Sequence, residues 1–243
     1  MKRGQVSVFF IVGIVIIGLV LFFFLFRSEL EIDNVSGDVR PLYDFVQGCV
    51  DSTAQDGLEY IGESGGYFDS PELSNVVGVA YHYYGKESYL PEKEDIANEL
   101  EKYMNTMLFF CTRNFVDFPD YEVEQSKVKS EVEILDEKVV VKVIYPLSIK
   151  KGDDGYSLKN FDSDVGVRLG VIYEVMEELM KEQLDEKENI CISCIGRLAE
   201  EKELLIDMHA KGNDEVTFFI IDQKSVVNEE SYLFKYVMKY DEI

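Results

Sequence analysis

The chain has 243 residues, of which 47% are hydrophobic, so it can bury the core of one large domain or two small ones. It carries 24 Lys and Arg against 47 Asp and Glu, which gives a formal net charge of −23 at pH 7. A surface this acidic repels phosphate backbones, so nucleic acid is excluded as an expected partner. Solubility, or adaptation to a salty exterior, is the simpler explanation of the charge.

The first predicted element is an apolar segment from Val6 to Phe26, which contains no charged residue and is interrupted only by Ser7, Gly13 and Gly18. As a helix with a rise of about 1.5 Å per residue it spans roughly 31 Å, close to the thickness of the hydrocarbon core of a bilayer. A cleavable secretory signal has a shorter apolar run, of about 7–15 residues, followed by small residues. The segment therefore predicts a retained transmembrane helix in contact with lipid.

The residues on either side of this segment predict its orientation. Lys2 and Arg3 precede it, whereas acidic residues dominate the polar stalk predicted over residues 27–40. The positive-inside rule then places the N-terminus in the cytoplasm and the body outside the cell. Asn34 begins an N-glycosylation sequon just beyond the membrane, where a glycosylating enzyme would reach it.

The six residues from Lys2 to Ser7, KRGQVS, lead directly into the apolar segment. This arrangement resembles the class III signal peptide of archaeal type IV pilin-like proteins. The resemblance implies that a prepilin-type peptidase cuts between Gly4 and Gln5, and that residues 1–26 otherwise supply the core helix of a filament. The sequence departs from the pattern at Phe9, where many of these proteins carry a Glu that aligns subunits. The resemblance implies an archaeal, exported, helix-anchored protein more directly than it implies a pilus.

Residues 41–119 predict a helical section. Apolar residues recur at spacings of three and four over residues 41–64 and again over residues 91–115, which is typical of amphipathic helices. A proline suits the first turn of each helix, and a glycine pair ends the first. Alternating Val and Tyr side chains predict a short strand over residues 78–84 between the two helices.

Residues 120–243 predict a section of mixed strands and helix. The expected elements are a β-hairpin over residues 128–134 and 139–149, a helix over residues 165–180 with candidate N-caps at Asp162, Ser163 and Asp164, and strands over residues 204–209, 216–221 and 232–240. The overall expectation is an α+β fold in which a mostly antiparallel sheet is covered by that helix. The pattern does not say whether the two sections share one core.

Cys49 and Cys111 each lie on the apolar stripe of their own predicted helix. If the helices pack antiparallel, the two thiols can meet. Outside the cell we favour a disulfide, which would close a loop of about 60 residues and stabilise the fold by roughly 4 kcal/mol. The alternative is two buried free thiols, a common state for cysteine.

Cys191 and Cys194 form a single C-x-x-C motif. A zinc ribbon needs a second such pair, which the sequence lacks, so no metal site is predicted here. A second, tight disulfide is one interpretation and unbridged cysteines are the other. A thioredoxin-like redox role is a further alternative, although the βαβ context expected for that role is missing.

His82 and His209 are the two histidines, and neither belongs to a catalytic triad, a zinc-protease motif or a phosphate-binding loop. We interpret both as ordinary core or surface residues in preference to metal ligands. The acidic stretches at residues 152–155 and 162–164 lack the spacing of an EF-hand, and turn and cap roles explain them. No catalytic residue, metal or cofactor is predicted.

These features predict a single-pass protein of the cell membrane with a cytoplasmic N-terminus and an acidic extracellular body. The predicted role is structural, adhesive or pilin-like, through protein partners or self-assembly, and the chain is not expected to be an enzyme. The alternative is a membrane-tethered thiol–disulfide protein that acts through Cys191 and Cys194.

Overall fold

The computed structural model describes residues 36–187 and 189–240. The chain divides into two compact units, and the boundary between them follows Arg40. The predicted transmembrane segment, the predicted cleavage site and Asn34 of the glycosylation sequon all lie outside the described residues. Among the described helices, none combines the length and apolarity needed to cross a membrane.

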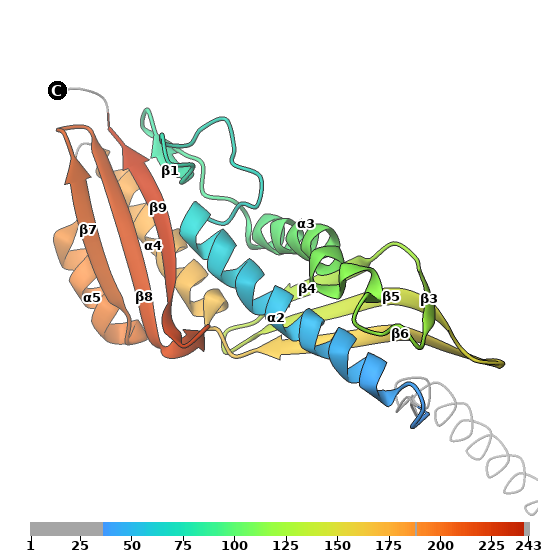
Figure 1. The fold of residues 1–243 in the computed structure, drawn as a ribbon. Coiled ribbons are helices and arrows are strands. Elements are labelled where there is room, and N and C mark those ends of the chain that lie inside the picture. Colours follow the sequence, from blue (N-terminus) through green and yellow to red (C-terminus); the bar gives the residue numbers. More distant parts are fainter. Residues whose placement is uncertain (1–35, 188, 241–243) are drawn as a thin grey trace, which may run out of the picture. The chain divides into compact units, whose positions relative to one another are not determined.

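The two amphipathic helices predicted in the first half of the chain are both present (Figure 1). They are α2 (Arg40–Ser64) and α3 (Lys93–Thr112), and each buries its apolar stripe. Gly65 and Gly66 end α2 with φ angles of +82° and +93°, a conformation that only glycine adopts without strain. A short 3-10 turn, η2 (Arg113–Phe115), follows α3.

The middle of the chain forms an antiparallel sheet around a long central strand, β5 (Val139–Lys151). The strands β3 (Glu122–Gln125) and β4 (Lys129–Ile134) pair with one edge of β5, and β6 (Asp154–Val165) pairs with the other. The predicted hairpin is therefore confirmed as β4 and β5. Pro146 lies where the pairing of β5 with β6 shifts register, a position that tolerates a missing backbone donor.

The prediction that residues 162–164 cap a helix is wrong. These residues belong to β6, because Gly152, at φ +63°, reverses the chain tightly and lets it return along the free edge of β5. A central strand needs hydrogen-bonding partners on both edges, and this need outweighs the capping preference of Asp and Ser. The covering helix α4 (Leu169–Asp185) begins later, after an N-cap at Arg168 that makes no side-chain cap bond.

The three predicted C-terminal strands are present as β7 (Leu205–Lys211), β8 (Glu215–Val227) and β9 (Glu230–Lys239). Two strands from the first half of the chain extend this sheet: β1 (Tyr81–Tyr84) pairs in parallel with β9, and β2 (Glu87–Ser88) pairs with β1. The strand order is β2-β1-β9-β8-β7. One sheet thus combines residues from both sides of the section boundary expected near Pro119.

A short helix that the sequence did not predict, α5 (Ile192–Lys202), lies beside α4 on one face of the C-terminal sheet (Figure 1). It is 11 residues long and buries only Ile195 and Leu198. Together the described elements make an α+β fold with mostly antiparallel sheets, as the sequence predicts.

Two glycines bring α2 close to its neighbours. A Cβ on Gly57 would lie 2.6 Å from the Cδ1 of Leu100 in α3, and a Cβ on Gly62 would lie 2.4 Å from the carbonyl oxygen of Leu233 in β9. The second distance involves backbone and is shorter than real Cβ contacts. Hence α2 packs against α3 and against β9 at separations that an ordinary side chain would prevent.

Candidate functional site

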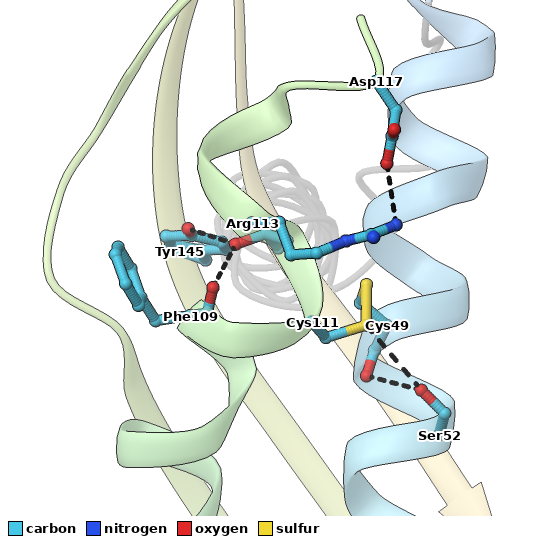
Figure 2. The surroundings of a disulfide bond; sticks show 8 residues. Cys49, Ser52, Phe109, Cys111, Arg113, Asp117 and Tyr145 are labelled. Atoms are coloured by element: carbon cyan, nitrogen blue, oxygen red, sulfur yellow. Dashed lines mark hydrogen bonds and ion pairs between the residues drawn. A yellow bond between two sulfur atoms is a disulfide. The ribbon is translucent and has the colours of Figure 1, made fainter.

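A disulfide joins α2 to the last turn of α3 (Figure 2). Cys49 and Cys111 have an S–S distance of 2.08 Å and a Cα–Cα distance of 5.6 Å, which is normal disulfide geometry. Ser52 donates a hydrogen bond to the carbonyl oxygen of Cys49 at 3.2 Å, and its Oγ lies 4.0 Å from the Cys111 sulfur. The structure supports the predicted bridge over the alternative of two free thiols.

The end of α3 next to this disulfide exposes two adjacent aromatic side chains. Phe109 is 44% exposed and Phe110 is 62% exposed, and their rings meet edge to face at 5.8 Å. A groove of about 480 Å³ runs beside Phe109. The groove is lined by Asn105, Phe109, Gln125, Ser126, Lys127, Val128 and Tyr145. We call the Phe109–Phe110 pair and this groove the α3 contact surface.

The α3 contact surface has a fixed backbone. Thr112 donates a hydrogen bond to the carbonyl oxygen of Phe109 at 3.1 Å, and its Oγ1 lies 3.4 Å from the hydroxyl of Tyr145 in the central strand of the neighbouring sheet (Figure 2). Arg113 forms an ion pair with Asp117 at 2.8 Å just beyond the helix. Covalent and polar contacts therefore fix the backbone that carries the exposed side chains of Phe109 and Phe110.

The second cysteine pair lies at the beginning of α5. Cys191 is the N-cap residue, and a disulfide joins it to Cys194 with a Cα–Cα distance of 5.3 Å. The backbone N–H of Cys194 donates to the Cys191 sulfur at 3.3 Å, and the hydroxyl oxygen of Ser193 lies 3.5 Å from the same sulfur. Both cysteines are half-buried, and Ile192 between them is 61% exposed.

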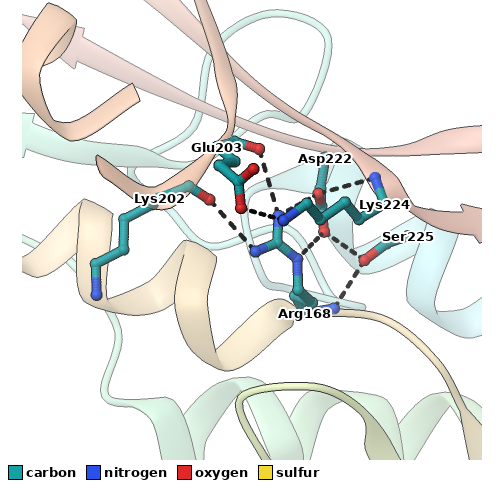
Figure 3. Close-up of polar contacts among 6 residues, drawn as sticks. All are labelled: Arg168, Lys202, Glu203, Asp222, Lys224 and Ser225. Atoms are coloured by element: carbon teal, nitrogen blue, oxygen red, sulfur yellow. Dashed lines mark hydrogen bonds and ion pairs between the residues drawn. The ribbon is translucent and has the colours of Figure 1, made fainter. Parts of the chain in front are cut away.

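The far end of α5 is attached to a buried ion pair that the sequence analysis missed (Figure 3). The Arg168 guanidinium donates to both carboxylate oxygens of Asp222, at 2.9 and 2.6 Å, and to the carbonyl oxygens of Lys202 and Glu203 at 3.3 and 3.4 Å. Ser225 accepts a hydrogen bond from the Arg168 backbone N–H at 2.9 Å and donates to Asp222. These bonds join the start of α4 and the end of α5 to β8.

Electrostatics explain why Asp222 stays charged although its side chain is fully buried. Burial by itself raises the pKa of Asp222, but hydrogen bonds from Arg168 and Ser225 outweigh this effect and hold the pKa below its usual value. The same pairing raises the pKa of Arg168. The two opposite charges are therefore paired within the protein interior, where each compensates the cost of burying the other.

His82 is fully buried in the C-terminal sheet. Its Nε2 lies 2.9 Å from the carbonyl oxygen of Gly65, and its ring stacks on Tyr236 at 4.8 Å, which in turn stacks on Phe218 at 4.9 Å. Burial lowers the pKa of His82 to about 4. The residue therefore packs as a neutral core side chain, as the sequence analysis preferred.

His209 lies on the surface with its Nε2 3.4 Å from a carboxylate oxygen of Asp207. Within residues 36–187 and 189–240, no group of three or more His, Cys, Asp or Glu side chains is arranged to hold a metal ion.

Comparison with known proteins gave no match, whether to a family model, to a curated protein or to a solved structure.

Proposed function

We propose that the chain is a single-pass membrane protein, anchored by the segment from Val6 to Phe26, whose body outside the cell acts by contact in a structural, adhesive or pilin-like role. The sequence of the segment and its flanking charges support the anchor and the orientation. The two disulfides support the location, because disulfides form and persist in oxidising surroundings and are rare in the cytosol.

The observation that carries the contact role is the α3 contact surface. Phe109 and Phe110 are exposed although each is large and apolar, and the Cys49–Cys111 disulfide fixes the helix end that presents them. Exposed aromatic side chains on a rigid support lose little conformational entropy when a partner covers them, which makes them effective contact residues. The partner is another protein chain, either a second copy or a different surface protein.

Labelling of intact cells tests the location. After mild reduction, a membrane-impermeant maleimide should modify Cys191 and Cys194 on intact cells, and peptide mapping by mass spectrometry would read the label. Modification only after lysis would place the body in the cytosol and contradict the proposal. The mass of the mature chain tests processing, since cleavage after Gly4 predicts a chain that begins at Gln5. An intact Met1 on surface-exposed material would rule out prepilin-type processing.

Site-specific crosslinking tests the contact role. A photoreactive phenylalanine at position 110 of the full-length chain in its native membrane should form protein adducts. The same group at position 77, where Val77 is 78% exposed in the turn region between α2 and β1, is the matched control and should form fewer adducts. Equal yields at the two positions, or adducts with lipid only, would contradict a protein contact at the α3 contact surface.

A further inference from the structure

The two disulfides have different surroundings. Cys49 and Cys111 are 62 residues apart and join two helices, and Cys49 is buried. Cys191 and Cys194 are 3 residues apart, join nothing beyond the first turn of α5, and are both half-buried. A loop this short constrains the unfolded chain far less than the long one does. The fold therefore depends less on the second disulfide than on the first, and the second is also the more accessible one.

The sulfur of Cys191 occupies a position that stabilises a thiolate. As the N-cap of α5, Cys191 lies at the positive end of the helix dipole, where the first backbone N–H groups lack the partners that they would have inside a helix. The N–H of Cys194 already points at this sulfur, and the Ser193 hydroxyl is within reach of it. Cysteines at helix N-termini and in C-x-x-C motifs are more readily ionised than free thiols.

The rest of α5 is fixed, so the first turn can change its bonding without displacing the helix. Arg168 holds the carbonyl oxygens of the last turn, as described above. Arg197 forms an ion pair with Glu178 of α4 at 2.7 Å, and Lys202 forms one with Glu174 at 2.7 Å. The exposed side chain of Ile192, between the two cysteines, offers an apolar contact for a polypeptide that approaches the sulfur atoms.

From these features we propose that Cys191–Cys194 is an exchangeable disulfide that oxidises pairs of thiols in other polypeptides outside the cell, and that Cys191 forms the mixed disulfide. A thiolate of the partner attacks the Cys191 sulfur, and the S–S bond breaks with Cys194 leaving as the thiolate. The second partner thiolate then attacks the partner sulfur in the mixed disulfide, and Cys191 leaves. The partner gains a disulfide and loses two electrons and two protons, which the Cys191–Cys194 pair takes up as two thiols.

This activity is additional to the contact role and requires only that the body lies outside the cytosol. The first test uses the full-length chain in detergent and a tagged peptide that carries two reduced cysteines. Oxidation of the peptide should be at least tenfold faster with the native chain than with the double variant Cys191→Ser, Cys194→Ser. The double variant Cys49→Ser, Cys111→Ser is the matched control and should retain the native rate per folded molecule.

The second test assigns the roles of the two sulfurs. In the single variant Cys194→Ser, the remaining Cys191 thiol should form a mixed disulfide with the oxidised peptide at least tenfold faster than Cys194 does in the variant Cys191→Ser. Equal rates in the two variants would overturn the assignment of Cys191. Circular dichroism of each variant checks the fold, and a replacement by Ala serves where Ser unfolds the chain.

A measurement on the unmodified chain covers the case in which every variant is unstable. With a limiting amount of dithiothreitol, mass mapping should find Cys191–Cys194 reduced before Cys49–Cys111. If the two disulfides are reduced at the same rate, or if the native chain oxidises the peptide no faster than the double variant at positions 191 and 194, the proposal is wrong.

Discussion

Arg168, at the start of α4, and Asp222, where the pairing of β8 with β9 shifts register, form a bidentate ion pair inside the protein. The Asp222 side chain is fully buried and that of Arg168 is 10% exposed, so neither charge has water to replace a lost partner. The hydrogen bonds of this pair connect α4, α5 and the C-terminal sheet, because each of the three contributes atoms to them.

Replacement of Asp222 by Asn should destabilise the fold by about 3–5 kcal/mol, because it leaves the Arg168 guanidinium buried without a countercharge. Urea titration of the full-length chain in detergent measures this change. The matched control is Glu203→Gln, which removes the exposed ion pair with Lys224 and should cost less than about 1 kcal/mol. Similar losses in the two variants would show that the burial of the pair has no energetic consequence.

Because of His82, the free energy of unfolding should decrease as the pH decreases. Burial lowers the pKa of this residue from 6.5 to about 4, against the opposite effect of its hydrogen bond with Gly65. The unfolded chain therefore binds a proton below pH 6.5 that the folded chain binds only near pH 4. The contribution is fully present above pH 6.5 and is lost as the pH falls to about 4, with a total of about 3 kcal/mol.

The many carboxylates also titrate in this range, so the test compares two proteins. Between pH 6.5 and pH 4, the native chain should lose about 3 kcal/mol of unfolding free energy relative to the variant His82→Phe. The Phe variant keeps an aromatic ring against Tyr236 but cannot take up the proton. A difference that stays constant with pH would show that His82 does not titrate in this way.

Substitutions of two glycines in α2 should have opposite effects. Gly62→Ala places a methyl group against the backbone of β9 and should cost about 1–3 kcal/mol. Gly48→Ala, on the exposed side of the same helix with no atom within 4 Å, should stabilise by about 1 kcal/mol through helix propensity. Thermal unfolding followed by circular dichroism measures both. Destabilisation by Gly48→Ala would indicate that this face of α2 is covered.

The two disulfides should contribute unequally to stability. Removal of Cys49–Cys111 by paired Ala substitutions should cost about 4 kcal/mol on the chain-entropy estimate, whereas removal of Cys191–Cys194 should cost about 2 kcal/mol. Denaturant titrations of both double variants, compared with the native chain, measure the two values. A larger loss from the second pair would mean that it serves the fold more than the chemistry proposed for it.

Elements whose evidence is local in the sequence were predicted well. The stripes of α2 and α3, and the alternation in β4 and β5, depend on neighbouring residues. The Cys49–Cys111 pairing followed from the same stripes, because each cysteine occupied a core-facing position on its helix. Periodicity thus identifies both the element and the face that it buries.

Other contacts between distant residues left no local signal in the sequence. The pairing of Tyr81 with Val237 joins the two halves of the chain, and Arg168 and Asp222 are 54 residues apart without any motif. β6 was missed because its acidic residues are also good helix caps, and only the empty edge of β5 decides between the two roles. Such choices are made by tertiary contacts, which override local preference.

The position of β9 has a consequence for biosynthesis. This strand follows β8 in the sequence but is inserted between β1 and β8, so the sheet has a gap until residues 230–239 have been synthesised. The residues of β1 emerge from the ribosome long before their neighbour exists. Completion of the sheet must therefore wait until β9 has been synthesised, and a chain that is truncated before β9 leaves β1 paired with β2 alone.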